Sequence, residues 1–221
     1  TDNHKIRKFT KDNPDRRSAV VFLAKNRVGY HNLAKLSSHA FIDGLYAGCP
    51  RIDKELLIQY KEGLIATTGG LNAEIPNLIL NIGENQAEEA FIWWHENFGE
   101  DFYIELVRHG LDENDHVNNV LLNFARKYNV KYFASNNVFY LDKKDAVSHD
   151  LLLCVKNGVL KDTPIGKGRG FRFGFPNDEF YFKSQDDMKE LFIDLPESIE
   201  TTQEISDKIE VYDLKRDVLL P

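Results

Sequence analysis

The sequence predicts an α/β fold in which parallel strands are covered by helices, and two features of the chain indicate it. Short apolar runs of the strand type alternate with longer segments whose apolar residues recur at helical spacing. Parallel neighbours in a sheet need a long crossover connection, usually a helix, so this alternation is typical of a parallel sheet. The pattern fits a closed barrel and an open sheet equally well.

In the first half of the chain the predicted elements are a strand, two helices, a second strand and a third helix. In that order they span residues 18–24, 30–41, 53–60, 63–68 and 86–98. Asp53 stands where an N-cap side chain is needed, and the second strand ends at Gly69 and Gly70. The third helix is predicted from an apolar stripe, namely Ala90, Phe91, Trp94 and Phe98.

The second half begins with a strand at residues 102–107, followed by the clearest helix of the chain. That helix is predicted from the stripe Val117, Val120, Leu121, Phe124, Ala125 and Tyr128. Residues 130–140 are β-rich, and residues 145–155 are again helical. The composition changes after Gly158, where a glycine-rich basic loop and a short helix precede a last amphipathic helix at residues 197–209.

The composition indicates a folded domain in a reducing compartment. Hydrophobic residues make up 42% of the 221 residues and charged residues 29%, which is enough for a sizeable core. Cys49 and Cys154 are the two cysteines, and a secreted domain of this size usually carries more, so we expect a cytoplasmic location. No run approaches the roughly 20 apolar residues that span a bilayer, so no membrane contact is expected.

The glycine-rich loop at residues 163–170 is the first candidate site. Lys167, Arg169 and Arg172 lie beside three phenylalanines, which are Phe171, Phe173 and Phe175, and this mixture favours nucleic-acid binding by charge and stacking. The net charge of −7 confines such binding to a local patch. The alternative is a hairpin whose phenylalanines face the core while its arginines face water.

Acids and histidines near the predicted strand ends are the second candidate. Glu74, Glu105 and Asp150 are placed to be general acids, metal ligands or helix caps, and no acid-base pair can be assigned among them. Glu74 begins a helix, so capping is its first interpretation. Asp145 and His149 are separated by one helical turn, a spacing that places two ligands on one face. The sequence contains no recognised metal motif or nucleophile elbow.

Five strings in series resemble a known family. They are residues 23–33 (LAKNRVGYHNL), 63–76 (GLIATTGGLNAEIP), 103–110 (YIELVRHG), 145–152 (DAVSHDLL) and 179–192 (EFYFKSQDDMKELF). In this order and spacing they look like the N-terminal region of the bacterial DNA polymerase III alpha-subunit family, a region formed by a polymerase-and-histidinol-phosphatase (PHP) domain.

This resemblance implies an incomplete, distorted (βα)7 barrel of the PHP type with a small C-terminal α+β extension. Residues 1–158 would be a truncated PHP domain whose first strands, with the family's first histidine motifs, lie upstream. Residues 159–221 would be the extension that leads toward the polymerase palm. The charged beginning and the apolar end of the chain agree with a piece of a longer polypeptide.

The resemblance also implies where metal ligands of active members would lie, and the sequence departs from that pattern. A ligand cysteine is replaced by Gly70, and an Asp and a His are replaced by Asn137 and Phe139. A further histidine is expected at about residue 18 or 19, where serine and alanine stand. Glycine and phenylalanine offer no donor, and a neutral amide does not offset repulsion between clustered cations. We therefore expect a vestigial site, with no catalytic residue, metal or other cofactor in this piece.

Two functions follow as the main alternatives, and a third possibility is a free-standing nucleic-acid-binding module that uses Lys167, Arg169 and Arg172. The first is a structural and docking domain of a replicative DNA-directed DNA polymerase, whose own catalysis uses Mg²⁺ held elsewhere and whose partners are DNA, a proofreading exonuclease and other replicase subunits. The second is an active metal-dependent phosphoesterase or 3′–5′ exonuclease of the same fold. Because a truncated barrel exposes a sheet edge, we expect the chain to dimerise there or to cover the edge with its N-terminal arm.

Overall fold

The computed structural model describes residues 3–10 and 16–215. In this part of the chain, four strands alternate with eight α-helices and two short 3-10 helices. The elements in chain order are β1 (Phe22–Ala24), α1 (Arg27–Ile42), α2 (Lys54–Gln59), β2 (Leu64–Thr67), α3 (Glu74–Asn81), α4 (Glu84–Phe98), η1 (Gly99–Asp101), β3 (Phe102–Val107), α5 (Asp112–Tyr128), β4 (Tyr132–Ser135), η2 (Lys143–Asp145), α6 (Ala146–Asn157), α7 (Gln185–Leu191) and α8 (Glu197–Asp207).

The strands form one sheet in the order β1-β2-β3-β4. β2, β3 and β4 run parallel, as the alternation predicts, with Ile104 opposite Tyr132 in the register of β3 and β4. β1 runs antiparallel to β2, which the sequence pattern does not predict. The α/β class is confirmed. The sheet formed by the described residues is open, so the closed (βα)7 barrel is not confirmed.

The reversed direction of β1 follows from a close approach of two glycines. Asn26 caps α1 directly after β1, and its side-chain oxygen accepts from the Gly29 N–H at 3.0 Å. Gly29 lies so close to the loop before β2 that a Cβ on it would meet the Gly63 carbonyl oxygen at 2.0 Å. The beginning of α1 and the beginning of β2 are thus held together. Since β1 ends where α1 begins, β1 and β2 must run in opposite directions.

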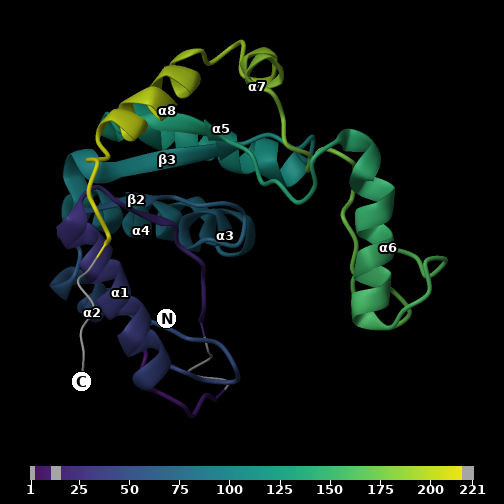
Figure 1. Ribbon diagram of the computed structural model, residues 1–221, viewed down its shortest axis with the longest axis horizontal. Coiled ribbons are helices and arrows are strands. Elements are labelled where there is room, and N and C mark those ends of the chain that lie inside the picture. Colours follow the sequence, from purple (N-terminus) through teal and green to yellow (C-terminus); the bar gives the residue numbers. More distant parts are fainter. Residues whose placement is uncertain (1–2, 11–15, 216–221) are drawn as a thin grey trace.

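Helices cover both faces of the sheet, because successive strand side chains point to opposite sides. In β3, Phe102, Ile104 and Leu106 join the main apolar core with α4 and α5. Tyr103 between them points the other way and packs with Ile205 of α8. This alternation explains why all six residues of β3 are buried. α8 lies along β3 and β4 although it is distant from them in sequence (Figure 1).

α6 and the loop that follows it project from the sheet, away from the body formed by the other elements (Figure 1). The helix predicted at residues 145–155 is confirmed, but several of its apolar side chains are exposed: Val147, Leu151, Leu152 and Val155. Only Cys154 is buried among the residues of α6. The apolar residues of α6 thus follow the spacing of a core-facing helix, but the described residues leave most of them exposed to solvent.

The strands are shorter than predicted at both ends of the sheet. The run at residues 18–24 contributes only β1, with Ala19 in an isolated bridge to Ala73. The β-rich run at residues 130–140 contributes only β4, because after Ser135 the chain leaves β3 and pairs next through a single bridge of Tyr140 with Tyr181. Within the described residues, no helix combines the length and apolar character that crossing a membrane requires.

Candidate functional site

The carboxyl ends of β2 and β3 bring together polar groups that are buried and mutually satisfied. The Thr67 hydroxyl donates to Glu105 Oε2 at 2.9 Å, and the Glu105 N–H donates to the Thr68 hydroxyl oxygen at 2.9 Å. All three residues are buried. Ligands of α/β proteins bind outside the carboxyl ends of the strands, so this is the expected edge for chemistry. Here it is closed by hydrogen bonds within the protein.

His109, just beyond β3, has both ring nitrogens occupied. Its Nδ1 lies 3.1 Å from the carbonyl oxygen of Glu179, which only accepts, so Nδ1 carries the proton. Its Nε2 accepts from the Asn137 N–H at 3.3 Å. The ring is 2% exposed and stacks on Phe180 with centroids 4.3 Å apart. Burial lowers the pKa of His109 below its usual value, in agreement with a neutral ring.

Two of the three predicted vestigial positions meet at this edge. A Cβ at Gly70 would have the side-chain nitrogen of Asn137 as its neighbour, at 3.6 Å. Phe139 lies apart from them in an aromatic cluster, with its ring 4.6 Å from that of Phe175. The cluster reaches the edge through Phe180, which stacks on His109. Gly70 and Asn137 are thus neighbours, and Phe139 is connected to this edge through the rings of Phe175 and Phe180.

The remaining sequence candidates bind other parts of the protein. Glu74 accepts from Lys54 Nζ at 2.8 Å and from Trp94 Nε1 at 2.7 Å. The Asp145 carboxylate accepts from the Asp142 N–H at 3.1 Å, so it caps a turn and does not join His149 in a ligand pair. In the described part of the chain, no three His, Cys, Asp or Glu side chains are grouped so that they could hold a metal.

The basic loop is arranged opposite to the hairpin alternative, because Arg172 is buried while the phenylalanines on either side of it are exposed. Arg172 is 6% exposed, and its guanidinium forms a bidentate ion pair with Asp150 at 2.6 and 2.8 Å. It is therefore not free to bind nucleic acid, because its donors are used to hold the loop. Lys167 and Arg169 are exposed, as predicted. Phe171 and Phe173 also point outward and not into the core.

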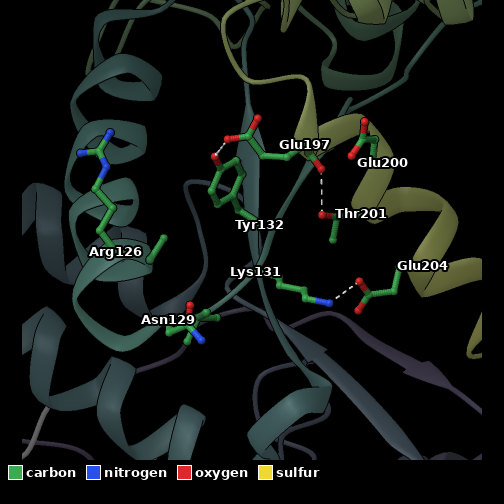
Figure 2. Close-up of a pocket in the computed structure, with 10 residues that line it drawn as sticks. Arg126, Asn129, Lys131, Tyr132, Glu197, Glu200, Thr201 and Glu204 are labelled. Atoms are coloured by element: carbon green, nitrogen blue, oxygen red, sulfur yellow. Dashed lines mark hydrogen bonds and ion pairs between the residues drawn. The ribbon is translucent and has the colours of Figure 1, made fainter.

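A groove of about 450 Å³ lies between α5, β4 and α8 (Figure 2). Figure 2 shows two pairs among its polar side chains: the Tyr132 hydroxyl donates to Glu197, and Lys131 forms an ion pair with Glu204. Burial, with the neighbouring Glu197, raises the pKa of Tyr132 to about 12. The groove lies at the amino end of β4, away from the strand ends that form active sites. Its side chains fasten α8 to the sheet.

Residues 5–109 match the PHP domain family. The chain is 40% identical over 189 residues to the DNA polymerase III subunit alpha of Borreliella burgdorferi, covering 86% of this chain and 16% of that protein. It is 41% identical over 179 residues to the same subunit of Thermus aquaticus, covering 81% of this chain and 14% of that protein. It is 37% identical over 203 residues to the DNA polymerase III subunit alpha of Treponema pallidum, covering 91% of this chain and 17% of that protein.

The α/β class of the fold agrees with the similarity of residues 5–109 to the PHP domain family. Most of the chain is homologous to part of the DNA polymerase III subunit alpha of bacteria, which confirms the resemblance in the five strings. The chain spans about a sixth of the length of these curated relatives.

Sequence reasoning missed the role of His109, although the string at residues 103–110 contains it. Its partners, the Glu179 carbonyl and the Asn137 N–H, come from segments 70 and 28 residues away. No local signal reveals such partners.

Proposed function

We propose that this chain is part of a replicative DNA polymerase and serves there as a structural and docking domain without a hydrolytic metal centre. The similarity to DNA polymerase III subunits alpha supports the first half of this proposal. The side chains at the carboxyl ends of β2 and β3 support the second half, namely that the domain has no hydrolytic metal centre. Gly70 and Phe139 offer no donor, and Glu105 and His109 are committed to bonds within the protein.

The donor set at this edge does not suit a cation cluster. Divalent ions close together need anionic ligands to offset their mutual repulsion. Glu105 is the buried carboxylate present, and Thr67 already donates to it. His109 would have to give up the Asn137 N–H before its Nε2 became free to bind a metal. We therefore assign this edge to packing.

Metal analysis of the full-length polymerase tests this assignment. After dialysis without chelator, we expect zinc, manganese and iron well below one equivalent per chain by mass spectrometry. Incubation with each metal should produce no hydrolysis of a 3′-labelled oligonucleotide attributable to this domain. Stoichiometric metal that is lost when Glu105→Gln and His109→Gln are combined would instead establish the phosphoesterase or exonuclease alternative.

The polymerase activity itself is assigned to parts of the subunit outside this chain. Template-directed nucleotide transfer uses Mg²⁺ held by carboxylates, and the relative from Borreliella burgdorferi is about five times as long as this chain. We propose residues 1–158 as the PHP portion and residues 159–221 as an extension leading toward the catalytic part.

Partners would be DNA, a proofreading exonuclease and other replicase subunits. Primer extension by the full-length protein with Mg²⁺, and co-purification of an exonuclease with it, test these proposals; loss of either would contradict the corresponding one.

The free edge of β4 supports the proposal that the sheet belongs to a larger barrel-like structure. The Ile104 N–H donates to the Lys131 carbonyl at 3.0 Å, and main-chain groups alternate sides along a parallel strand. Tyr132 and Ala134 therefore direct their N–H and C=O groups away from β3. The arm at residues 3–10 does not cover them, since Arg51 donates to the carbonyls of His4 and Ile6 near α2.

An unpaired edge is costly, so we propose that the isolated chain associates through β4. Light scattering across a range of concentrations should show the mass rising from that of one chain toward that of two. A constant single-chain mass would refute the association.

A further inference from the structure

A small cavity lies where α6 meets the chain after it, outside the strand-end edge. Its volume is about 220 Å³, roughly seven times the share of one water molecule in the liquid, a size that suits one planar heterocycle. Three aromatic rings line it: Tyr140, His149 and Phe175. The His149 ring centroid lies 5.3 Å from that of Tyr140 and 5.1 Å from that of Phe175. Lys161, Asp150 and Asn177 add polar groups to the lining.

The loop beside this cavity is held in one conformation from within. Arg172 Nε donates to the Thr163 carbonyl at 2.8 Å, while its terminal nitrogens bind Asp150. The Gly166 N–H donates to the Arg172 carbonyl at 3.0 Å, and the Arg172 N–H donates to the Pro164 carbonyl at 2.9 Å. A loop fixed in this way loses little conformational entropy when it binds a ligand.

The same loop presents aromatic rings and cations outward. Phe171 is 51% exposed and Phe173 is 62% exposed, although large apolar rings on a loop normally turn inward. Lys161, Lys167 and Arg169 are exposed, and no ion pair is formed by them with the described residues. In residues 156–172, five cations stand against one carboxylate, in a chain whose net charge is −7. The loop is thus a locally basic and aromatic surface on a protein whose net charge is negative.

We propose that this cavity and loop bind single-stranded DNA. One base enters the cavity between the rings of Tyr140 and Phe175, and a neighbouring base stacks on Phe173. Phosphates contact Lys161, Lys167 and Arg169, which lie along the loop and so suit a strand better than one phosphate group. Base stacking on aromatic rings together with cations along a backbone is how proteins hold single strands without reading sequence.

Single-stranded DNA fits this surface better than an apolar protein partner. The rings and cations are interleaved in sequence, so burying the rings under a protein would also desolvate Lys167 and Arg169, which no described carboxylate pairs. The binding itself does not depend on the proposed polymerase function; only the choice of DNA over RNA rests on it. Oligonucleotide binding and primer extension are separate measurements, so either proposal can fail alone.

The test is fluorescence anisotropy of labelled oligothymidylate titrated with the 221-residue chain over a series of salt concentrations. We expect a Kd on the order of 1–100 µM at physiological salt, weakening as salt rises. Phe173→Ala should weaken binding at least about fivefold by removing a stacking surface. Lys167→Glu combined with Arg169→Glu should weaken binding further and make the salt dependence shallower by about one to two in log–log slope. Ala146→Leu, which fills the cavity without changing charge, should also weaken binding.

Two matched variants separate this site from general effects. Phe41→Ala removes a ring on α1 that is 58% exposed, and Lys189→Glu reverses an exposed charge on α7; both should leave the affinity unchanged. Equal losses in these controls, absence of binding near 1 mM protein, or dTTP binding as tight as the oligomer would each overturn the proposal. Salt-independent binding would overturn it too, since that outcome favours a protein partner for the loop. Circular dichroism of each variant confirms that it is folded.

Discussion

Arg172 and Asp150 join the loop after α6 to the helix itself, through two parallel contacts of 2.6 and 2.8 Å between guanidinium nitrogens and carboxylate oxygens. The guanidinium lowers the pKa of the Asp150 carboxyl, so the ion pair persists at neutral pH. The pair turns the arginine of a Phe-Arg-Phe run inward, and this places both flanking rings in solvent. A single buried contact therefore decides which side chains the loop displays.

Arg172→Lys should loosen the loop although it keeps the positive charge. Lysine lacks the planar fork that binds both oxygens of Asp150 and the Thr163 carbonyl together. Hydrogen exchange of the Gly166 and Arg172 amides should accelerate about tenfold, which corresponds to about 1.4 kcal/mol lost from the loop. The exposed Arg169→Lys is the control. Unchanged exchange in the first variant would show that the ion pair does not order the loop.

Stability should fall with acid because of His109. Burial places its folded-state pKa below the value of about 6.5 expected in the unfolded chain. The neutral ring thus stabilises the fold fully above that unfolded value, and the contribution is lost as the pH falls from there toward the folded pKa, by at most about 1.4 kcal/mol per pH unit. His109→Gln keeps one donor and one acceptor and should reduce this slope.

Urea denaturation above and below the unfolded-state pKa of His109 measures that effect. His116→Gln is the matched control, because it makes the same replacement at a histidine that is exposed on α5. An identical acid slope in the His109 variant would assign the acid sensitivity to other groups.

Adjacent glycines at the end of β2 should respond differently to a side chain. Gly69 has φ of +69°, and a Cβ there would meet the Ala73 Cβ at 2.7 Å. At Gly70 the nearest neighbour of such a Cβ is the side-chain nitrogen of Asn137 at 3.6 Å, an ordinary contact. Gly69→Ala should lower the free energy of unfolding by about 2 kcal/mol or more, and Gly70→Ala by less than about 0.5 kcal/mol. Equal costs would contradict the strand-end geometry.

Glu204 should contribute more to stability than its neighbour on the same helix. It accepts from the Tyr103 hydroxyl at 2.8 Å and pairs with Lys131, so Glu204→Ala leaves a mostly buried hydroxyl without its acceptor. Thermal or urea denaturation should show a loss of about 1–2 kcal/mol. Glu200→Ala, one turn away on α8, should change stability by less than about 0.5 kcal/mol. If the two variants are equivalent, α8 is held by its apolar contacts alone.

Patterns that act over a few residues predicted much of the molecule. The stripe from Val117 to Tyr128 gave α5, Asp53 caps α2 as expected by accepting from the Leu56 N–H, and the five strings gave the family. These features depend on helical periodicity, local capping and residue order, all of which are written in neighbouring positions.

The loop shows where such reasoning stops. Alternation of Phe and Arg predicts two faces, yet it does not say which face is buried. Asp150 lies 22 residues before Arg172, and it selects the inward face by offering a carboxylate beside the loop. The reversed β1 has a similar origin, since the contact of Gly29 with Gly63 joins segments far apart in sequence.

By itself, therefore, the sequence determined the α/β class, most helices, the homology and the residue types at each candidate position. The tertiary structure alone decided that Arg172 is buried, that His109 is neutral with both nitrogens bound, and that aromatic rings line a cavity beside α6. These outcomes depend on contacts between residues far apart in sequence. Buried polar groups must be hydrogen-bonded, and only the packed chain brings their partners within reach.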